Sequence, residues 1–184
     1  MIWLIVLLVI VVGLALLFVV LYNRLVRLRN RVDNAWAQIE VQLKRRWDLI
    51  PNLIETVKGY AAHERETFDS VTQARAAAQQ AGTPAQTAQA EGILGAALGR
   101  LFAVAEAYPE LQADENFRQL QTELAETENR IAVSRQVYND SVLSFNNAIQ
   151  TFPGLAVAGP FNFTVREFFE VEEEAQREAP VVDF

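Results

Sequence analysis

The chain contains a run of twenty residues, Ile2 to Leu21, that carries no charge. As a helix rising about 1.5 Å per residue, this run spans roughly 30 Å, the thickness of the hydrocarbon core of a bilayer. Seventeen of the twenty residues are Leu, Ile, Val or Phe. On an insertion scale these contribute roughly −5 to −10 kcal/mol together. The sequence therefore predicts that this segment crosses a membrane and anchors everything that follows.

The main alternative for this segment is a cleaved signal peptide, which has a basic leader, a shorter apolar stretch and small residues at the cut site. Here no Lys or Arg precedes the run, and Tyr22-Asn23-Arg24-Leu25 follows it, so we predict a retained anchor. Four arginines come directly after the run: Arg24, Arg27, Arg29 and Arg31. The positive-inside rule then predicts an N-terminus outside and a body in the cytoplasm, with the inverted orientation as the alternative.

Composition limits the classes of partner. The net charge of −7 argues against nucleic acid, which requires a basic surface. The absence of cysteine excludes a disulfide scaffold and thiolate metal sites. Seven acids and two arginines lie in residues 162–184, so anionic lipid would repel this tail; a solvated tail without a partner is the alternative.

Helical periodicity organises the body after residue 22. We predict an anchor at 1–22, a helical domain at 23–153 with helices at about 24–81, 84–108 and 115–152, and a C-terminal tail at 154–184. Apolar residues recur every three or four positions from Leu25 to Ala61, which is typical of one buried stripe on a long helix. Because this stripe keeps its phase across Pro51, we expect a kinked but continuous helix, joined almost without a break to the anchor.

The other two helices have clear start signals, Thr83-Pro84 and Asp114. Gly92, Gly95 and Gly99 share one face of the second helix, which indicates either close packing of a neighbour or a loose region. The third helix has apolar residues seven apart: Phe117, Leu124, Ile131, Tyr138, Phe145 and Phe152. This register predicts an all-α, intramolecular antiparallel bundle of three to four helices.

The tail after Pro153 contains an aromatic cluster of Phe161, Phe163, Phe168 and Phe169. We expect these rings to dock back onto the bundle, with an exposed patch for a partner as the alternative. A short fourth helix over about Thr164–Glu178 is compatible with the composition.

No catalytic or metal-binding pattern emerges. His63-Glu64 lacks the second histidine of a zinc protease, since position 67 is Thr. One histidine in the chain also rules out two-His and three-His zinc sites within a subunit. We therefore predict no enzyme, no cofactor and no metal, and expect His63 at a surface helix position.

Polar residues around Pro51 are more informative. Arg45, Arg46, Asp48, Pro51 and Asn52 combine charge and a helix kink within one short segment. A structural hydrogen-bond network that fixes the helix register is one interpretation. A groove for a ligand or partner at the kink is the other.

The chain resembles the bacterial LemA family along essentially its whole length. The most specific motif that carries the resemblance is the stretch from Val41 to Leu53, which contains Arg45-Arg46-x-Asp48-Leu49-Ile50-Pro51-Asn52-Leu53. Before it comes Arg29-Asn30-x-Val32, and after it come Thr56 to Ala61 and His63-Glu64. The later motifs are Glu106-x-Tyr108-Pro109-x-Leu111, Glu128 to Ala132, Tyr138-Asn139, Asn146 and Phe152-Pro153. The resemblance implies a single N-terminal anchor, a cytoplasmic bundle of long antiparallel helices and no known catalytic activity. It also implies an accessory role in the bacterial envelope, with a membrane protease as a candidate partner.

These observations favour a membrane-anchored, non-enzymatic scaffold or adaptor of the bacterial inner membrane. We expect it to self-assemble on the cytoplasmic face, so its partners would be the bilayer and further copies of the chain. The glycine face and the late phenylalanines are the candidate contacts between copies. A sensor that binds a ligand near Asp48, Pro51 and Asn52 and signals through the first helix is the alternative. A hydrolase using His63, Glu64 or Glu66 is a further one.

Overall fold

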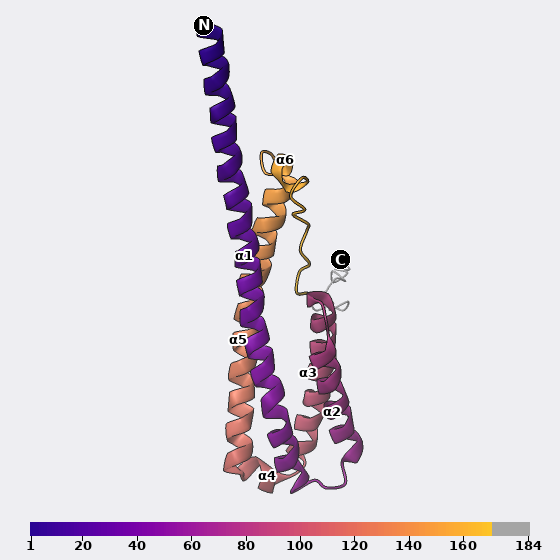
Figure 1. Cartoon of the computed structure of the whole chain (residues 1–184). Coiled ribbons are helices and arrows are strands. Elements are labelled where there is room, and N and C mark those ends of the chain that lie inside the picture. Colours follow the sequence, from indigo (N-terminus) through magenta and orange to yellow (C-terminus); the bar gives the residue numbers. More distant parts are fainter. Residues whose placement is uncertain (171–184) are drawn as a thin grey trace, which may run out of the picture. The chain divides into compact units, whose positions relative to one another are not determined.

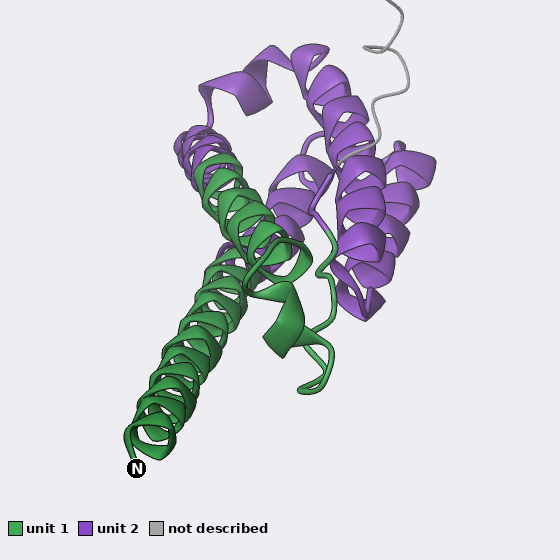
Figure 2. Cartoon of the chain, turned by 90° about the horizontal axis from the view of Figure 1, so that it is seen from above, with its two compact units in different colours: residues 1–41, 131–167 green, residues 42–130, 168–184 purple. Residues whose placement is uncertain are grey.

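The computed structural model describes residues 1–170, and these form helices without any strand (Figure 1). This confirms the predicted all-helical fold. The helices are α1 (Ile2–Lys58), α2 (Arg65–Gln80), α3 (Pro84–Glu106), α4 (Pro109–Ala113), α5 (Glu115–Gln150) and α6 (Leu155–Ala158). They belong to two compact units (Figure 2). Within the described residues, unit 1 comprises Met1–Val41 and Ile131–Glu167, and unit 2 comprises Gln42–Arg130 and residues 168–170.

Helix α1 is a single helix that includes both the apolar run and the first bundle helix, as predicted. Residues 2–20 are exposed along their whole length. Within the described residues α1 is the one helix long and apolar enough to cross a membrane. The buried stripe begins at Leu25, which is 1% exposed, so α1 changes from an exposed apolar surface to a surface buried in the core within about one turn of Leu21.

The predicted helix over 24–81 is wrong only in its continuity, because α1 ends at Lys58 and α2 begins at Arg65. Gly59 follows Lys58, and glycine costs about 1 kcal/mol in a helix interior relative to alanine. The reversal places Lys58 Nζ 5.4 Å from the centre of the Phe68 ring. Ala61 in the turn is buried beside Val57, so the three-and-four spacing continues through residues that are not helical.

Helix α3 begins as predicted, since Thr83 Oγ1 accepts a hydrogen bond from the Gln86 amide at 3.3 Å and Pro84 is the first helical residue. Among the described residues, no helix packs closely against the glycine face of α3 at Gly95 or Gly99. A methyl group at Gly95 would meet only the Arg46 guanidinium at an ordinary contact distance, and one at Gly99 would have nothing within 4 Å. The prediction of close packing is therefore not supported at Gly95 or Gly99.

Helix α5 is capped by Asp114, whose Oδ1 accepts the Phe117 amide at 2.9 Å. The sevenfold register of apolar residues is buried from Phe117 to Phe145. It fails at Phe152, which is 80% exposed because α5 ends at Gln150. The last member of the predicted seam therefore lies in a turn and faces outward.

Unit 1 is built from α1 up to Val41 and from the second half of α5, which run antiparallel. Leu21 and Leu25 lie beside Ala148 and Thr151, while the Trp36 and Tyr138 rings are 5.3 Å apart. After α6 the chain returns along this pair from Phe163 to Glu167, and it is non-helical through Glu170. The predicted helix over Thr164–Glu178 is therefore wrong through Glu170, and its remainder, like most of the acidic tail, lies outside the described residues.

Unit 2 holds the last part of α1 from Gln42 onward, helices α2 to α4 and the first half of α5 around one apolar core. Leu53, Val57, Val71, Leu101 and Leu111 are among its most completely buried side chains. Helices α2 and α3 form an antiparallel hairpin, in which Arg100 Nη2 donates to Ser70 Oγ at 2.9 Å. Tyr60 Oη donates to Asp114 Oδ2 at 3.1 Å, which ties the turn after α1 to the start of α5.

Candidate functional site

The strongest concentration of buried charge lies in unit 2, around Arg46. Its guanidinium Nη1 lies 3.0 Å from Glu91 Oε2 and 2.9 Å from Glu128 Oε2. Arg46 is 9% exposed and Glu91 is 6% exposed, so both charges have left bulk water. The second oxygen of Glu91 accepts a hydrogen bond from Trp47 Nε1 at 2.7 Å. Three helices, α1, α3 and α5, therefore meet at one charged cluster, which we call the Arg46 cluster.

Burial raises the pKa of the Glu91 carboxyl above its ordinary value. The Arg46 guanidinium and the Trp47 N–H lower it by smaller amounts, and the nearby Glu128 charge adds to the increase. The cost of removing this carboxylate from water thus outweighs the attraction of its partners. Such an arrangement fixes which faces of α1 and α3 meet, because any other register would leave one of the charges unpaired.

Pro51 creates a second polar contact in the same unit. Proline has no amide hydrogen, so the carbonyl oxygen four residues earlier, on Trp47, lacks its helical donor. Arg75 Nε, from α2, donates to this oxygen at 2.7 Å. The helix continues through Pro51 because a side chain from the neighbouring helix takes the place of the missing amide.

The predicted site residues around Pro51 lie in different environments. Arg46 is buried in the cluster, whereas Arg45, Asp48, Pro51 and Asn52 are exposed. Asp48 pairs with Lys44 at 3.1 Å, an exposed contact one turn apart that contributes little to stability. The structural interpretation thus applies to Arg46, and the other four positions are not brought together into a site.

Glu91 and Arg75 were missed by the sequence analysis. Glu91 could have been found, since Glu91 and Arg100 are the only charged residues between Pro84 and Ala105. A single acid in an otherwise alanine-, glycine- and leucine-rich helix indicates a buried partner. His63 is exposed as expected, but it lies in the turn between α1 and α2 instead of on a helix.

Unit 1 holds the returning segment in place through Asn146 of α5. Asn146 Nδ2 donates to the Arg166 carbonyl oxygen and Asn146 Oδ1 accepts the Arg166 amide, both at 2.9 Å. The Arg166 side chain pairs with Asp33 of α1 at 3.0 Å. Tyr138 Oη donates to the Glu167 carbonyl oxygen at 2.8 Å, and burial raises the pKa of Tyr138 to about 12, so this phenol keeps the proton it donates.

The four late phenylalanines do not form one surface. Phe163 is buried against Phe145 and Tyr22, and the Arg29 guanidinium lies 5.5 Å from the centre of its ring. Phe169 is 2% exposed and Phe168 is half-buried. Phe161 remains 45% exposed. Docking is therefore found at Phe163 and Phe169 and, in part, at Phe161, whose ring also contacts Phe18 and Tyr22 of α1.

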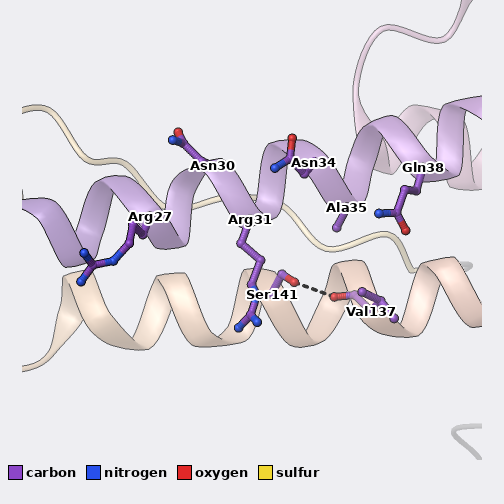
Figure 3. Close-up of a pocket in the computed structure, with 8 residues that line it drawn as sticks. All are labelled: Arg27, Asn30, Arg31, Asn34, Ala35, Gln38, Val137 and Ser141. Atoms are coloured by element: carbon purple, nitrogen blue, oxygen red, sulfur yellow. Dashed lines mark hydrogen bonds between the residues drawn. The ribbon is translucent and has the colours of Figure 1, made fainter.

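A shallow groove of about 380 Å³ lies on unit 1 between α1 and α5 (Figure 3). Its lining from α1 is polar, with Arg27, Asn30, Arg31, Asn34 and Gln38, while α5 contributes Val137 and Ser141. The Ser141 hydroxyl donates to the Val137 carbonyl oxygen of its own helix, so it does not compete for a ligand as a donor. Neither Arg27 nor Arg31 forms an ion pair within residues 1–170.

Comparison with known proteins places these features in a family. The chain is 27% identical over 187 residues to magnetosome protein MamQ 2 of Paramagnetospirillum magneticum, which covers 88% of this chain and 68% of that protein. It is 26% identical to MamQ of Magnetospirillum gryphiswaldense with the same coverage. It is 28% identical over 152 residues to Protein LemA of Metamycoplasma hominis, covering 82% of this chain and 69% of that protein. The family model for LemA matches residues 35–184, and the chain belongs to the LemA family.

Proposed function

We propose that this protein is a membrane-anchored helical scaffold that assembles with copies of itself on the cytoplasmic face of the bacterial inner membrane. The observation that carries the proposal is helix α1, which extends from Ile2 to Lys58 without interruption. Its apolar part is fully exposed, as a lipid-facing segment requires. The span is therefore continuous with the body, which suits a role in positioning other molecules at a set height above the bilayer.

An outward-facing strip on α3 is the contact that we assign to a second copy. The strip consists of four exposed residues whose spacing places them on one side of the helix: Ile93, Ala96, Gly99 and Ala103. Ile93 is 56% exposed, and the small neighbours allow another helix to approach closely. Because Gly99 has no neighbour within 4 Å, this side of α3 has room for an incoming helix.

The size of the particle in native membranes tests the proposal. Membranes extracted with an amphipathic polymer should yield the chain as a multimer together with its lipids. Ala96→Arg, on the proposed strip, should reduce the particle to a monomer. Ala76→Arg, at an exposed and polar part of α2, is the matched control and should leave the mass unchanged. A monomeric wild-type particle would overturn self-assembly, and mass spectrometry of the same particles would identify any membrane protease bound to the chain.

The groove on unit 1 favours a second candidate, a sensor of an anionic ligand. Two guanidinium groups, Arg27 and Arg31, line it one helical turn apart, and like charges at this spacing repel unless an anion lies between them. Inorganic phosphate is a suitable probe. Under this alternative it should raise the melting temperature of the wild type and not that of Arg27→Gln/Arg31→Gln, whereas a scaffold without this site should respond equally in both.

A further inference from the structure

The turn that follows α5, which spans residues 151–162 and includes the short helix α6, is unusually apolar for a surface segment. No charged residue lies between Asp140 and Arg166. Within this stretch Phe152 is 80% exposed, Leu155 is 46% exposed and Phe161 is 45% exposed. Exposed apolar residues that occur singly are ordinary, but these three lie in one turn-rich segment that ends next to the apolar part of α1.

Contacts with α1 fix the height of this segment relative to the membrane span. The Phe161 ring centre lies 5.6 Å from that of Phe18 and 5.0 Å from that of Tyr22. Phe18 is three residues inside the uncharged run that ends at Leu21, which corresponds to about 4.5 Å along a helix. Phe161 therefore lies at the level where the hydrocarbon core gives way to the headgroups.

Phe152 lies beside the end of the same uncharged run. It lines a small notch together with Leu21 and Arg24 of α1. Arg24 is the first charged residue after the span, and a long basic side chain at this position can extend to the lipid phosphates. The exposed rings thus occur where aromatic side chains are favoured in membrane proteins, at the boundary between apolar and polar lipid.

We propose that the turn containing Phe152, Leu155 and Phe161 inserts into the interfacial layer of the leaflet from which α1 emerges. The partner is the bilayer itself, because the segment is continuous with the span through the Phe161–Phe18 contact. The proposal rests on the membrane anchor of the proposed function. In this arrangement unit 1 has two points of attachment, the span and the turn, and the second point restricts rotation and tilt of the body about α1.

The chain contains no cysteine, so single cysteines can be introduced for spin labels without altering native thiols. The full chain is reconstituted in phosphatidylcholine vesicles with one label at Phe152→Cys, Leu155→Cys or Phe161→Cys. Leu8→Cys, within the span, reports on the anchor. Gln136→Cys, an exposed position of α5 in the same unit, serves as the matched label in water. Collision with oxygen, which concentrates in lipid, is compared with collision with a water-soluble nickel chelate.

Labels at Phe152 and Phe161 should give an oxygen-to-nickel ratio several-fold above that at Gln136 and below that at Leu8. Adding Phe152→Ser to the Leu155 label should lower its ratio. Ratios equal to that at Gln136, with a high ratio at Leu8, would overturn the inserted turn and leave the anchor intact. Protection from both reagents would show that protein covers the turn and would also overturn it. A low ratio at Leu8 would overturn both the inserted turn and the anchor.

Discussion

Arg75 Nε lies 2.7 Å from the Trp47 carbonyl oxygen, the oxygen that Pro51 leaves without a helical donor. A proline in a helix interior costs about 3 kcal/mol relative to alanine, in part because this oxygen loses its partner. The contact explains how a long helix accommodates a proline about two turns before its C-terminal end at Lys58. It also joins α2 to α1 at the same level as the Arg46 cluster, since Trp47 contributes its side chain to one and its backbone to the other.

The first prediction concerns the coupling of Arg75 to Pro51. Arg75→Ala should lower the free energy of unfolding by about 1.5–3 kcal/mol, since the contact is a hydrogen bond from a charged donor. The loss should be clearly smaller in a Pro51→Ala background, where the restored amide can bond to Trp47. Chemical denaturation of the four chains of this double-mutant cycle gives the coupling energy. Equal losses in both backgrounds would show that Arg75 acts independently of the proline.

The second prediction concerns the Arg46 cluster. Glu91→Ala should destabilise the chain by about 3–5 kcal/mol, because it leaves Arg46 buried with one partner fewer. The double replacement Arg46→Met/Glu91→Met should recover most of that loss, since apolar side chains of similar size avoid the desolvation of both charges. Thermal and denaturant unfolding measure both variants. A double variant as unstable as Glu91→Ala would indicate that the charges stabilise the fold by themselves.

The third prediction concerns pH. Burial raises the pKa of Glu91 in the folded chain above its reference value of 4.5. Its contribution to stability is therefore fully present below that value and is lost as the pH rises through the folded pKa. Glu91→Gln keeps an acceptor for Trp47 and does not titrate. The stability of the wild type minus that of Glu91→Gln should thus fall as the pH increases from 4 toward neutrality, and a difference that rises would mean that Arg46 outweighs burial.

The fourth prediction concerns Asn146, which bonds both backbone groups of Arg166. Asn146→Ala should leave these groups unpaired and release the returning segment of unit 1. Hydrogen exchange at the Arg166 amide should then accelerate by at least tenfold, corresponding to a loss of about 1.4 kcal/mol. Asn147→Ala, at the neighbouring exposed position, is the control. If both variants exchange alike, the segment is held by Phe163 and the Arg166–Asp33 pair without Asn146.

Local signals in the sequence predicted much of the fold. The uncharged run, the Thr83 and Asp114 caps and the sevenfold register of α5 each depend on neighbours within a few residues, and each was found where expected up to Phe145. The end of α1 was missed because buried Ala61 continues the spacing of the stripe through a turn. Gly59 was the available warning, since glycine is favoured where a helix ends.

The candidate site was only partly predictable, because its contacts join residues far apart in the chain. Arg46 was singled out, but its partner Glu91 is 45 residues away, and no local pattern links the two. Pro51 does predict that the Trp47 carbonyl needs a donor. It does not say which helix supplies it, since that depends on how α2 folds back against α1.

The uncharged run and the first bundle helix are one structural element, α1. Hydrogen exchange of amides 20–32, measured on the full chain in lipid vesicles, tests this continuity. A continuous helix should protect Leu21, Tyr22 and Arg24 to nearly the same degree as Val32, which lies in the buried stripe. Rapid exchange confined to residues 21–24 would show a flexible joint at the membrane surface and would contradict a single continuous helix.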